Sequence, residues 1–225
     1  VEAWGFTTGE YRVPNQAELE ELGDRIDYTQ VSLDQEGASL PDGMKLDLGA
    51  VAKGYTADRL AKLAQERGIT SALLDLGQST ILALGAKPDG SPWRIGIQDP
   101  QGEGYLGVLE LEGQAMGTSG GYQRYFERDG VRYWHIIDPA TAAPARSGLL
   151  SVTVVSPSGL ACDGLSTALF VMGLERGTQF WRDHPELEFE ALFILEDGSL
   201  ALTSGLKDSF TLAQGYEDRE VEVLS

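Results

Sequence analysis

Cysteine and histidine are scarce in this chain of 225 residues, and so are basic residues. Cys162 is the only cysteine, so the chain can form no internal disulfide, and with His135 and His184 alone it offers no Cys/His cluster for zinc. There are 17 Lys and Arg against 35 Asp and Glu, which gives a formal net charge of -18. Such a chain lacks the cationic surface that nucleic acid requires. We therefore expect no nucleic-acid partner.

Long apolar runs, internal repeats, low-complexity tracts and linkers are also absent. No run could span a bilayer, and Val1 does not open a signal peptide. The hydrophobic content of 42% is sufficient for a folded core. We therefore expect one domain over residues 1–225, with an α+β fold that combines a mainly antiparallel sheet with a few packed helices.

Short strand-like runs separated by glycine-containing turns dominate the pattern, and such turns favour antiparallel pairing. Strands or edge segments are expected over residues 1–6, 28–33, 39–48, 71–76, 80–86, 93–98, 105–111, 149–156, 189–195, 200–204 and 210–213. A hairpin is expected over 126–137. Helices are expected over 17–22, 51–67, 162–172 and 178–184. The acidic tail, residues 214–225, is expected to be frayed.

The stretch 47–58, DLGAVAKGYTAD, joins an apolar run at 44–48 to the helix expected over 51–67 and puts Lys53 in its first turn. Unpaired amides and the helix dipole favour an anion at such a place, and a lysine adds a full charge. The simpler alternative is a turn with close packing at its glycines and a solvated lysine. Taken alone, the stretch favours that alternative.

Asp163 and Thr167 lie four residues apart near the start of the helix expected over 162–172, so they project from one face. A carboxylate and a hydroxyl form an oxygen pair of the kind that Mg²⁺ accepts. In the alternative, Asp163 caps the helix and Thr167 bonds its own backbone. Spacing alone favours the cap.

His135 stands at a strand end, where it could take a proton from an attacking hydroxyl or be a partly buried, satisfied imidazole. A serine hydrolase is a further alternative, because residues 117–121 match G-x-S-x-G and Ser119, Asp163 and His184 follow in triad order. That motif needs a helix after the serine, whereas an aromatic hairpin pattern follows here. We therefore disfavour a hydrolase and expect His184 at the surface.

Five motifs follow one another along the chain: LDLGAVAKGYTAD, LLDLGQS, MGTSGGY, HIIDPAT and SVTVVSPSGLACDGLSTALFVMG. In this order they strongly resemble the FAD:protein FMN transferase (ApbE) family, from about residue 4 to residue 173. The resemblance implies an enzyme that binds FAD with Mg²⁺ and transfers the FMN half to a Thr or Ser hydroxyl of an acceptor protein, releasing AMP. FAD hydrolysis to FMN and AMP, or a non-catalytic flavin-binding module, are the alternatives.

The resemblance also implies roles for individual residues. The metal ligands are expected to be the backbone carbonyl of Ala50 and the side chains of Asp163 and Thr167. The flavin contacts are expected at Asp47, Lys53, the backbone of Ile137, Ser166, Thr118 and Ser119. His135 is the candidate base for the acceptor hydroxyl, with Asp163, beside the metal, as its competitor. Mg²⁺ and a lysine would offset the repulsion between a pyrophosphate and so acidic a chain.

Three departures accompany the resemblance. The family usually has two glycines where this chain has Gly77 and Gln78, and a glycine where this chain has Ala142. The family's N-terminal portion has no counterpart, so we expect this chain to be a piece of a longer protein. The resemblance further implies an exported, periplasmic or cell-surface lipoprotein that meets the membrane only through an N-terminal anchor outside this chain.

Overall fold

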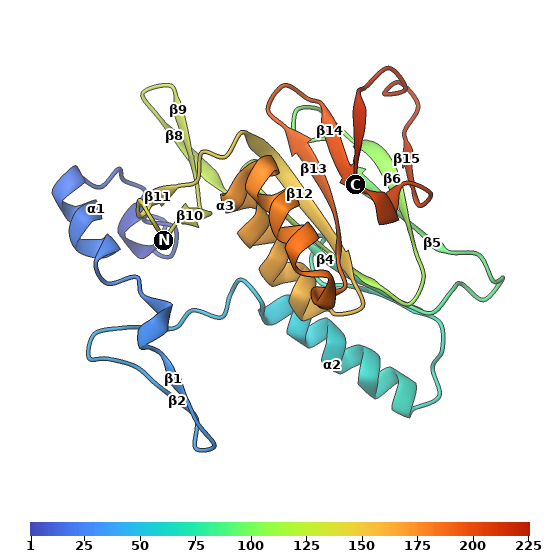
Figure 1. Cartoon of the computed structure of the whole chain (residues 1–225), viewed down its shortest axis with the longest axis horizontal. Helices are drawn as coiled ribbons and strands as arrows, with labels where there is room; N and C mark the ends of the chain where they lie inside the picture. The colour runs from blue at the N-terminus through green and yellow to red at the C-terminus, as the bar shows by residue number, and fades with distance from the viewer. The chain divides into compact units, whose positions relative to one another are not determined.

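A computed structural model describes residues 1–225 (Figure 1). The chain forms two compact units. One unit comprises residues 1–48 and 123–145, and the other comprises residues 49–122 and 146–225. The fold is α+β with mostly antiparallel sheets, as the sequence predicts. None of the helices combines the length and the apolar character needed to cross a membrane. The expectation of one domain over the whole chain stays a prediction.

A seven-stranded sheet forms the centre of the larger unit, in the order β16-β14-β13-β12-β7-β4-β3. Neighbouring strands in this sheet are antiparallel, except that β14 and β16 are parallel. The central strands are rich in Val, Ile, Leu and Ala and are buried on both faces. The strands are β3 (Ala72–Asp75), β4 (Thr80–Leu84), β7 (Ala115–Gly120), β12 (Leu149–Ser156), β13 (Glu190–Leu195), β14 (Leu200–Thr203) and β16 (Val221–Leu224).

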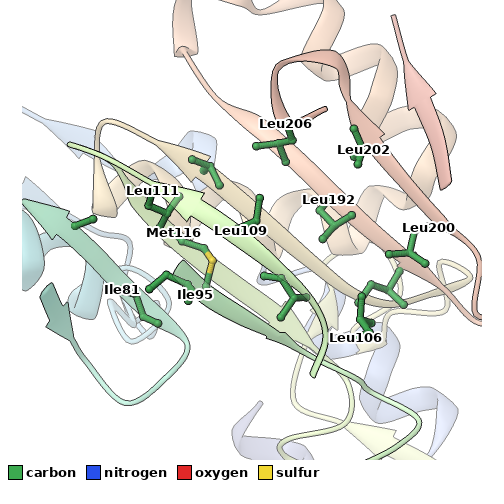
Figure 2. Close-up of a cluster of buried hydrophobic side chains, with 14 residues drawn as sticks. Ile81, Ile95, Leu106, Leu109, Leu111, Met116, Leu192, Leu200, Leu202 and Leu206 are labelled. Carbon is green, nitrogen blue, oxygen red and sulfur yellow. The ribbon is translucent and has the colours of Figure 1, made fainter. Parts of the chain in front are cut away.

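A second sheet of three strands, β15-β6-β5, shares a hydrophobic core with the first (Figure 2). Its strands are β5 (Trp93–Gln98), β6 (Tyr105–Leu111) and β15 (Phe210–Leu212). Ile95, Leu106 and Leu109 from this sheet lie in one cluster with Met116 and Leu192 from the larger sheet. This side of the larger sheet is therefore closed by apolar packing, and polar chemistry is left to the side that the helices cover.

Two helices, α2 (Ala52–Glu66) and α3 (Gly159–Asp183), pack against each other and against the larger sheet, α3 on β7 and β12 and α2 on β4. The expected break in the second helix is confirmed at Gly173, whose φ of 79° and ψ of 174° interrupt α3. Apolar residues recur at roughly helical spacing in 51–67, which predicts a buried apolar stripe on α2, and this prediction is wrong in detail. The helix buries small residues, while Tyr55, Leu60 and Leu63 are exposed. Small side chains bring the axis of α2 close to its neighbours.

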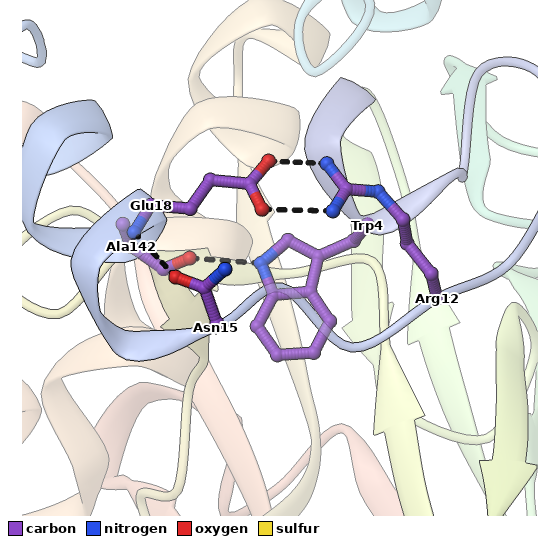
Figure 3. A network of polar contacts seen from close by, with 5 residues as sticks. All are labelled: Trp4, Arg12, Asn15, Glu18 and Ala142. Carbon is purple, nitrogen blue, oxygen red and sulfur yellow. Dashed lines mark hydrogen bonds and ion pairs between the residues drawn. The ribbon is translucent and has the colours of Figure 1, made fainter.

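The smaller unit is held by aromatic rings and by polar contacts around α1 (Gln16–Gly23), which Asn15 caps. Figure 3 shows the Trp4 indole donating to the carbonyl of Ala142 over 2.9 Å, and a two-bond ion pair between Arg12 and Glu18. The remaining elements are the 3-10 turns η1 (Glu2–Trp4) and η2 (Tyr28–Gln30) and the strands β1 (Ser32–Leu33), β2 (Ala38–Ser39), β8 (Tyr125–Arg128), β9 (Val131–Trp134), β10 (Ile137–Asp138) and β11 (Ala143–Pro144).

Several expected elements differ from the structure. Where a strand or edge segment is expected over residues 1–6, the structure has a 3-10 turn, and Trp4 and Phe6 are buried. In place of the strands expected over 28–33 and 39–48, the structure has only the short strands β1 and β2, and residues 44–48 form no strand. The expectation that residues 214–225 are frayed is also wrong, because β16 pairs with β14 and the Tyr216 hydroxyl donates to buried Asp99 over 2.8 Å.

Candidate active site

The helices α2 and α3 cross where neither carries a side chain. A Cβ atom placed on Gly54 would lie 2.0 Å from the carbonyl oxygen of Gly159, far inside van der Waals contact. Only glycine at position 54 permits this approach without a shift of backbone. The crossing brings together the N-terminal turns of two helices that are more than a hundred residues apart in the sequence.

Asp163, on α3, supplies the acceptor for the start of α2. Gly54 is the third residue of α2, so its amide has no partner within the helix, and it donates to Asp163 Oδ2 over 2.7 Å. The hydroxyl of Thr80 donates to the other oxygen, Oδ1, also over 2.7 Å. The expectation that Asp163 caps its own helix is wrong, because Ser158 is the N-cap of α3 and accepts from the amide of Ala161.

Asp58, on α2, makes the reciprocal contact with the start of α3. Its carboxylate accepts from the amides of Gly159 and Leu160 over 2.7 and 3.1 Å and from the hydroxyl of Ser158 over 2.9 Å. Each helix thus places a carboxylate on the other's N-terminus, where unpaired amides and the helix dipole favour negative charge. The exchange fixes the spacing between the two helix starts.

A group of hydroxyls continues from Asp163 along the same face of the sheet. Ser119 Oγ lies 2.9 Å from both Ser166 Oγ and Thr167 Oγ1, and Thr167 also bonds the carbonyl of Asp163 over 3.3 Å, as the sequence suggested. Ser119 lies within strand β7 and no helix follows it, while His184 bonds Glu186 over 2.9 Å. The strand-to-helix elbow that a serine hydrolase requires is therefore absent.

Lys53 lies in the first turn of α2, as expected, and its side chain is exposed. Its Nζ donates to Ser79 Oγ over 2.8 Å, which ties it to the loop between β3 and β4. In that loop Gln78 has a φ of 67°, in the left-handed region that favours glycine. The backbone here thus keeps the conformation of the glycine that the family resemblance leads one to expect.

The oxygens predicted to bind a metal fit Mg²⁺ in their chemistry. No cluster of three His, Cys, Asp or Glu side chains could hold a metal, so a site must use one carboxylate with hydroxyl and carbonyl oxygens. Mg²⁺ accepts such a set, because it usually takes one or two carboxylates and completes its shell with phosphate and water. A Cβ on Gly164 would lie 3.7 Å from Val51 Cγ1, so the segment that carries Ala50 runs beside Asp163.

The Asp163 carboxylate is buried without a positive partner. It is 9% exposed, it takes part in no ion pair, and its two donors, Gly54 and Thr80, are both neutral. Buried carboxylates are normally paired with a cation or coordinated to a metal. A carboxylate has about four acceptor positions, so two donors leave room for a cation.

Thr118 is separated from this group by the alternation of the strand. Its hydroxyl lies 2.8 Å from that of Thr153, on the face that Met116 shares with the hydrophobic core. The structure therefore brings Ser119, but not Thr118, to the side of Asp163. The other candidates, Asp47, His135 and Ile137, belong to the smaller unit.

His135 has the tautomer of a neutral base. Its Nδ1 lies 3.3 Å from the carbonyl of Arg124, which can only accept, so Nδ1 carries the proton and Nε2 keeps a lone pair. Burial lowers the pKa of His135, and the hydrogen bond to Arg124 opposes this only in part. By contrast, burial raises the pKa of the Cys162 thiol, which rules it out as a ready nucleophile.

Comparison with known proteins identifies the family. The profile of the ApbE family matches residues 1–193. The chain belongs to the ApbE family. The candidate site residues from Ala50 to Thr167 all lie within the matched range, so the family match covers both helix starts.

Named relatives in the ApbE family agree with this result. The chain is 38% identical to the FAD:protein FMN transferase of Treponema pallidum (strain Nichols), over 92% of this chain and 62% of that protein. It is 34% identical to one from Klebsiella pneumoniae (strain 342), over 96% and 68%. The chain thus spans about two thirds or less of these relatives.

Solved ApbE structures share the fold. The crystal structure of the ApbE protein of Thermotoga maritima matches with a TM-score of 0.85 at 36% identity, over 92% of this chain and 68% of that one. The apo flavinyl transferase ApbE of Pseudomonas stutzeri matches with a TM-score of 0.75 at 33% identity, over 88% and 62%. The expected fold class and family are confirmed.

Sequence reasoning missed Asp58 and Thr80 as parts of the site, whereas the close packing at Gly54 agrees with the simpler alternative for the stretch 47–58. Asp58 and Gly54 stand one helical turn apart in the stretch 47–58, and this spacing was the available signal. Nothing local marks Thr80, because its hydroxyl serves a carboxylate 83 positions away. Ala142, the other position where the family resemblance leads one to expect glycine, also has a left-handed φ, of 53°.

Proposed function

We propose that this chain is the part of a Mg²⁺-dependent FAD:protein FMN transferase that holds FAD and moves its FMN half to a Thr or Ser hydroxyl of an acceptor protein. The observation that carries the proposal is the buried Asp163 carboxylate, which has two neutral donors and forms no ion pair with a Lys, Arg or His side chain. The names of the relatives support the same reaction. FAD, Mg²⁺ and a protein acceptor are thus the expected partners.

The metal ligands would be Asp163, Thr167 and the Ala50 carbonyl, and Mg²⁺ held there would supply positive charge to offset the pyrophosphate and the leaving group. Lys53 adds a second positive charge at the start of α2, where free amides also favour an anion. The hydroxyls of Ser119 and Ser166 are available as neutral donors to the nucleotide. Because the chain as a whole is acidic, the FAD pyrophosphate would require local positive charge of this kind.

The proposed transfer is a displacement at the phosphorus of the FMN half. The acceptor hydroxyl oxygen forms the new bond to phosphorus, the bond to the AMP oxygen breaks, and AMP leaves with the electron pair. The hydroxyl proton goes to a base, for which we propose His135 Nε2, because the pKa of His135 is lowered and the ring is neutral at pH 7. Asp47 and the Ile137 backbone remain proposed flavin contacts, as does Thr118.

The mass of the acceptor tests the proposal. The chain would be incubated with FAD, Mg²⁺ and a candidate acceptor protein, and the acceptor then measured by intact-mass spectrometry. An added FMN mass that disappears after Thr/Ser replacement at the modified site supports transfer. Free FMN and AMP with an unchanged acceptor would instead favour hydrolysis. Unchanged FAD would favour a flavin-binding module, and either result contradicts transfer.

We also propose an exported location, in the periplasm or at the cell surface, with membrane attachment through a segment outside this chain. The support is the family resemblance alone. Fractionation of cells that express the full-length protein, followed by immunodetection, tests the location. Recovery in the cytosolic fraction alone would contradict it.

A further inference from the structure

The hydroxyl of Thr80 is a deeply buried polar group that contacts the candidate site. Thr80 is 1% exposed at the first position of β4, and its Oγ1 lies 2.7 Å from Asp163 Oδ1. An ionised carboxylate can only accept, so the hydroxyl must be the donor. The bond joins the sheet to α3 independently of the contact between α2 and α3.

We infer that Thr80 is a positioning residue for Asp163, which holds the carboxylate in the orientation that a bound cation requires. The inference rests on the proposed function, since it assumes that Asp163 meets a divalent cation. The terminal torsion of an aspartate is broad and roughly two-fold, so one donor leaves the carboxylate free to swing. Gly54 fixes Oδ2 and Thr80 fixes Oδ1, so neither oxygen can turn away.

Both donors are themselves rigid, and this distinguishes them from ordinary surface partners. The Gly54 amide is part of the first turn of α2, and Thr80 is backbone-paired with Gly117 in the sheet. The remaining acceptor positions of Asp163 therefore keep a constant direction before any cation arrives. Loss of such a partner behind a metal ligand typically costs about 10–100-fold in metal affinity.

A purely structural role for Thr80 is separable from this one by the choice of variants. Thr80→Val keeps the volume and removes the hydroxyl, whereas Thr80→Ser keeps the hydroxyl and removes the methyl group. Thr203→Val is the matched control. Thr203 is also fully buried, and its hydroxyl accepts from the Ala191 amide over 2.9 Å, on another strand and without contact to Asp163.

The test measures Mn²⁺ binding to the whole chain by electron paramagnetic resonance of the free ion, beside urea unfolding of each variant. We expect Thr80→Val to weaken Mn²⁺ binding about 10–100-fold. Thr80→Ser and Thr203→Val should bind as the wild type does, even where their unfolding midpoints fall. A Thr80→Ala and Thr80→Ser pair makes the same comparison if the valine variant does not fold.

Two results would overturn the inference, and they are distinct. Equal Mn²⁺ affinity in Thr80→Val and the wild type would show that the hydroxyl does not position the carboxylate, and would leave the proposed function standing. Absence of Mn²⁺ binding by the wild type would remove the cation itself, and the metal assignment of the proposed function would fall with the inference.

Discussion

Replacing Gly54 with alanine tests whether the approach of α2 and α3 is as close as the structure has it. The new Cβ would lie 2.0 Å from the Gly159 carbonyl oxygen, whereas ordinary contact begins at 3.4 Å, so the backbones must separate by the difference of 1.4 Å. A separation of that size also breaks the hydrogen bond from the Gly54 amide to Asp163, which is 2.7 Å long.

The expected loss of stability follows from these terms. Overpacking costs about 1–3 kcal/mol. A lost hydrogen bond to a charged group costs about 1.5–3 kcal/mol. The higher helix propensity of alanine returns at most about 1 kcal/mol. Even the low ends of these ranges leave a net destabilisation of about 1.5 kcal/mol for Gly54→Ala.

The assay is urea unfolding followed by circular dichroism, with Gly164→Ala as the control. A Cβ at Gly164, in α3, would meet only Val51 Cγ1 at 3.7 Å, so this variant should gain up to about 1 kcal/mol from helix propensity. The two variants make the same chemical change with opposite expected signs. A Gly54→Ala protein as stable as the wild type would refute the packing argument.

Four other substitutions or titrations test separate parts of the structure. Asp58→Ala should lower the free energy of unfolding by about 1–2 kcal/mol, because the amides of Gly159 and Leu160 at the start of α3 lose their acceptor, and Asp58→Asn should recover part of the loss in urea unfolding. Thr178→Val should be neutral or stabilising by about 1 kcal/mol in the same assay, since its buried hydroxyl has no partner. Tyr216→Phe should speed hydrogen exchange in β16, because Asp99 loses a donor. Burial in the folded state lowers the pKa of His135. The contribution of the neutral imidazole to stability is therefore full above about pH 6.5 and is lost as the pH falls below that value. His135→Gln should remove this pH dependence of the free energy of unfolding, measured by urea unfolding at several pH values.

Each of these has a contradicting result. A large loss in Thr178→Val would mean that the hydroxyl has a partner. Unchanged exchange in Tyr216→Phe would mean that strand pairing alone holds the tail. An identical pH slope in His135→Gln would assign the titration to another group. Unchanged stability in Asp58→Ala would mean that the Asp58 carboxylate does not stabilise the start of α3.

Local patterns were sufficient to predict the strands that lie in the cores. The bounds of β5, β6 and β12 agree with the expected ranges because each run is apolar and ends at a turn signal. The extent of α2 was also predictable from its periodicity and from Gly68 after its end. These elements depend on their own residues and on a generic apolar surface.

Contacts between distant segments were not predictable in the same way. The Met44 to Leu48 run has the apolar pattern of a strand but forms none in the structure. Val221–Leu224 was expected to be a frayed tail, but it pairs with β14 as β16. Asp163 accepts from the start of α2 and Asp58 accepts from the start of α3. Both contacts depend on a helix crossing that no local sequence pattern encodes. Family motifs marked Asp163, although they did not indicate that it also holds the start of α2.

The release of AMP from FAD in the presence of an acceptor protein, compared between the wild type and Asp163→Asn, is the most direct test of the central claim, that the carboxylate at the two helix starts carries the proposed transfer. The side-chain amide of the Asp163→Asn variant can still accept from Gly54 and bond Thr80, so the fold is retained while the charge is lost. We predict Mg²⁺-dependent AMP release by the wild type, measured by chromatography, and at least about 100-fold less by the variant. Equal AMP release by the two folded proteins would contradict the account.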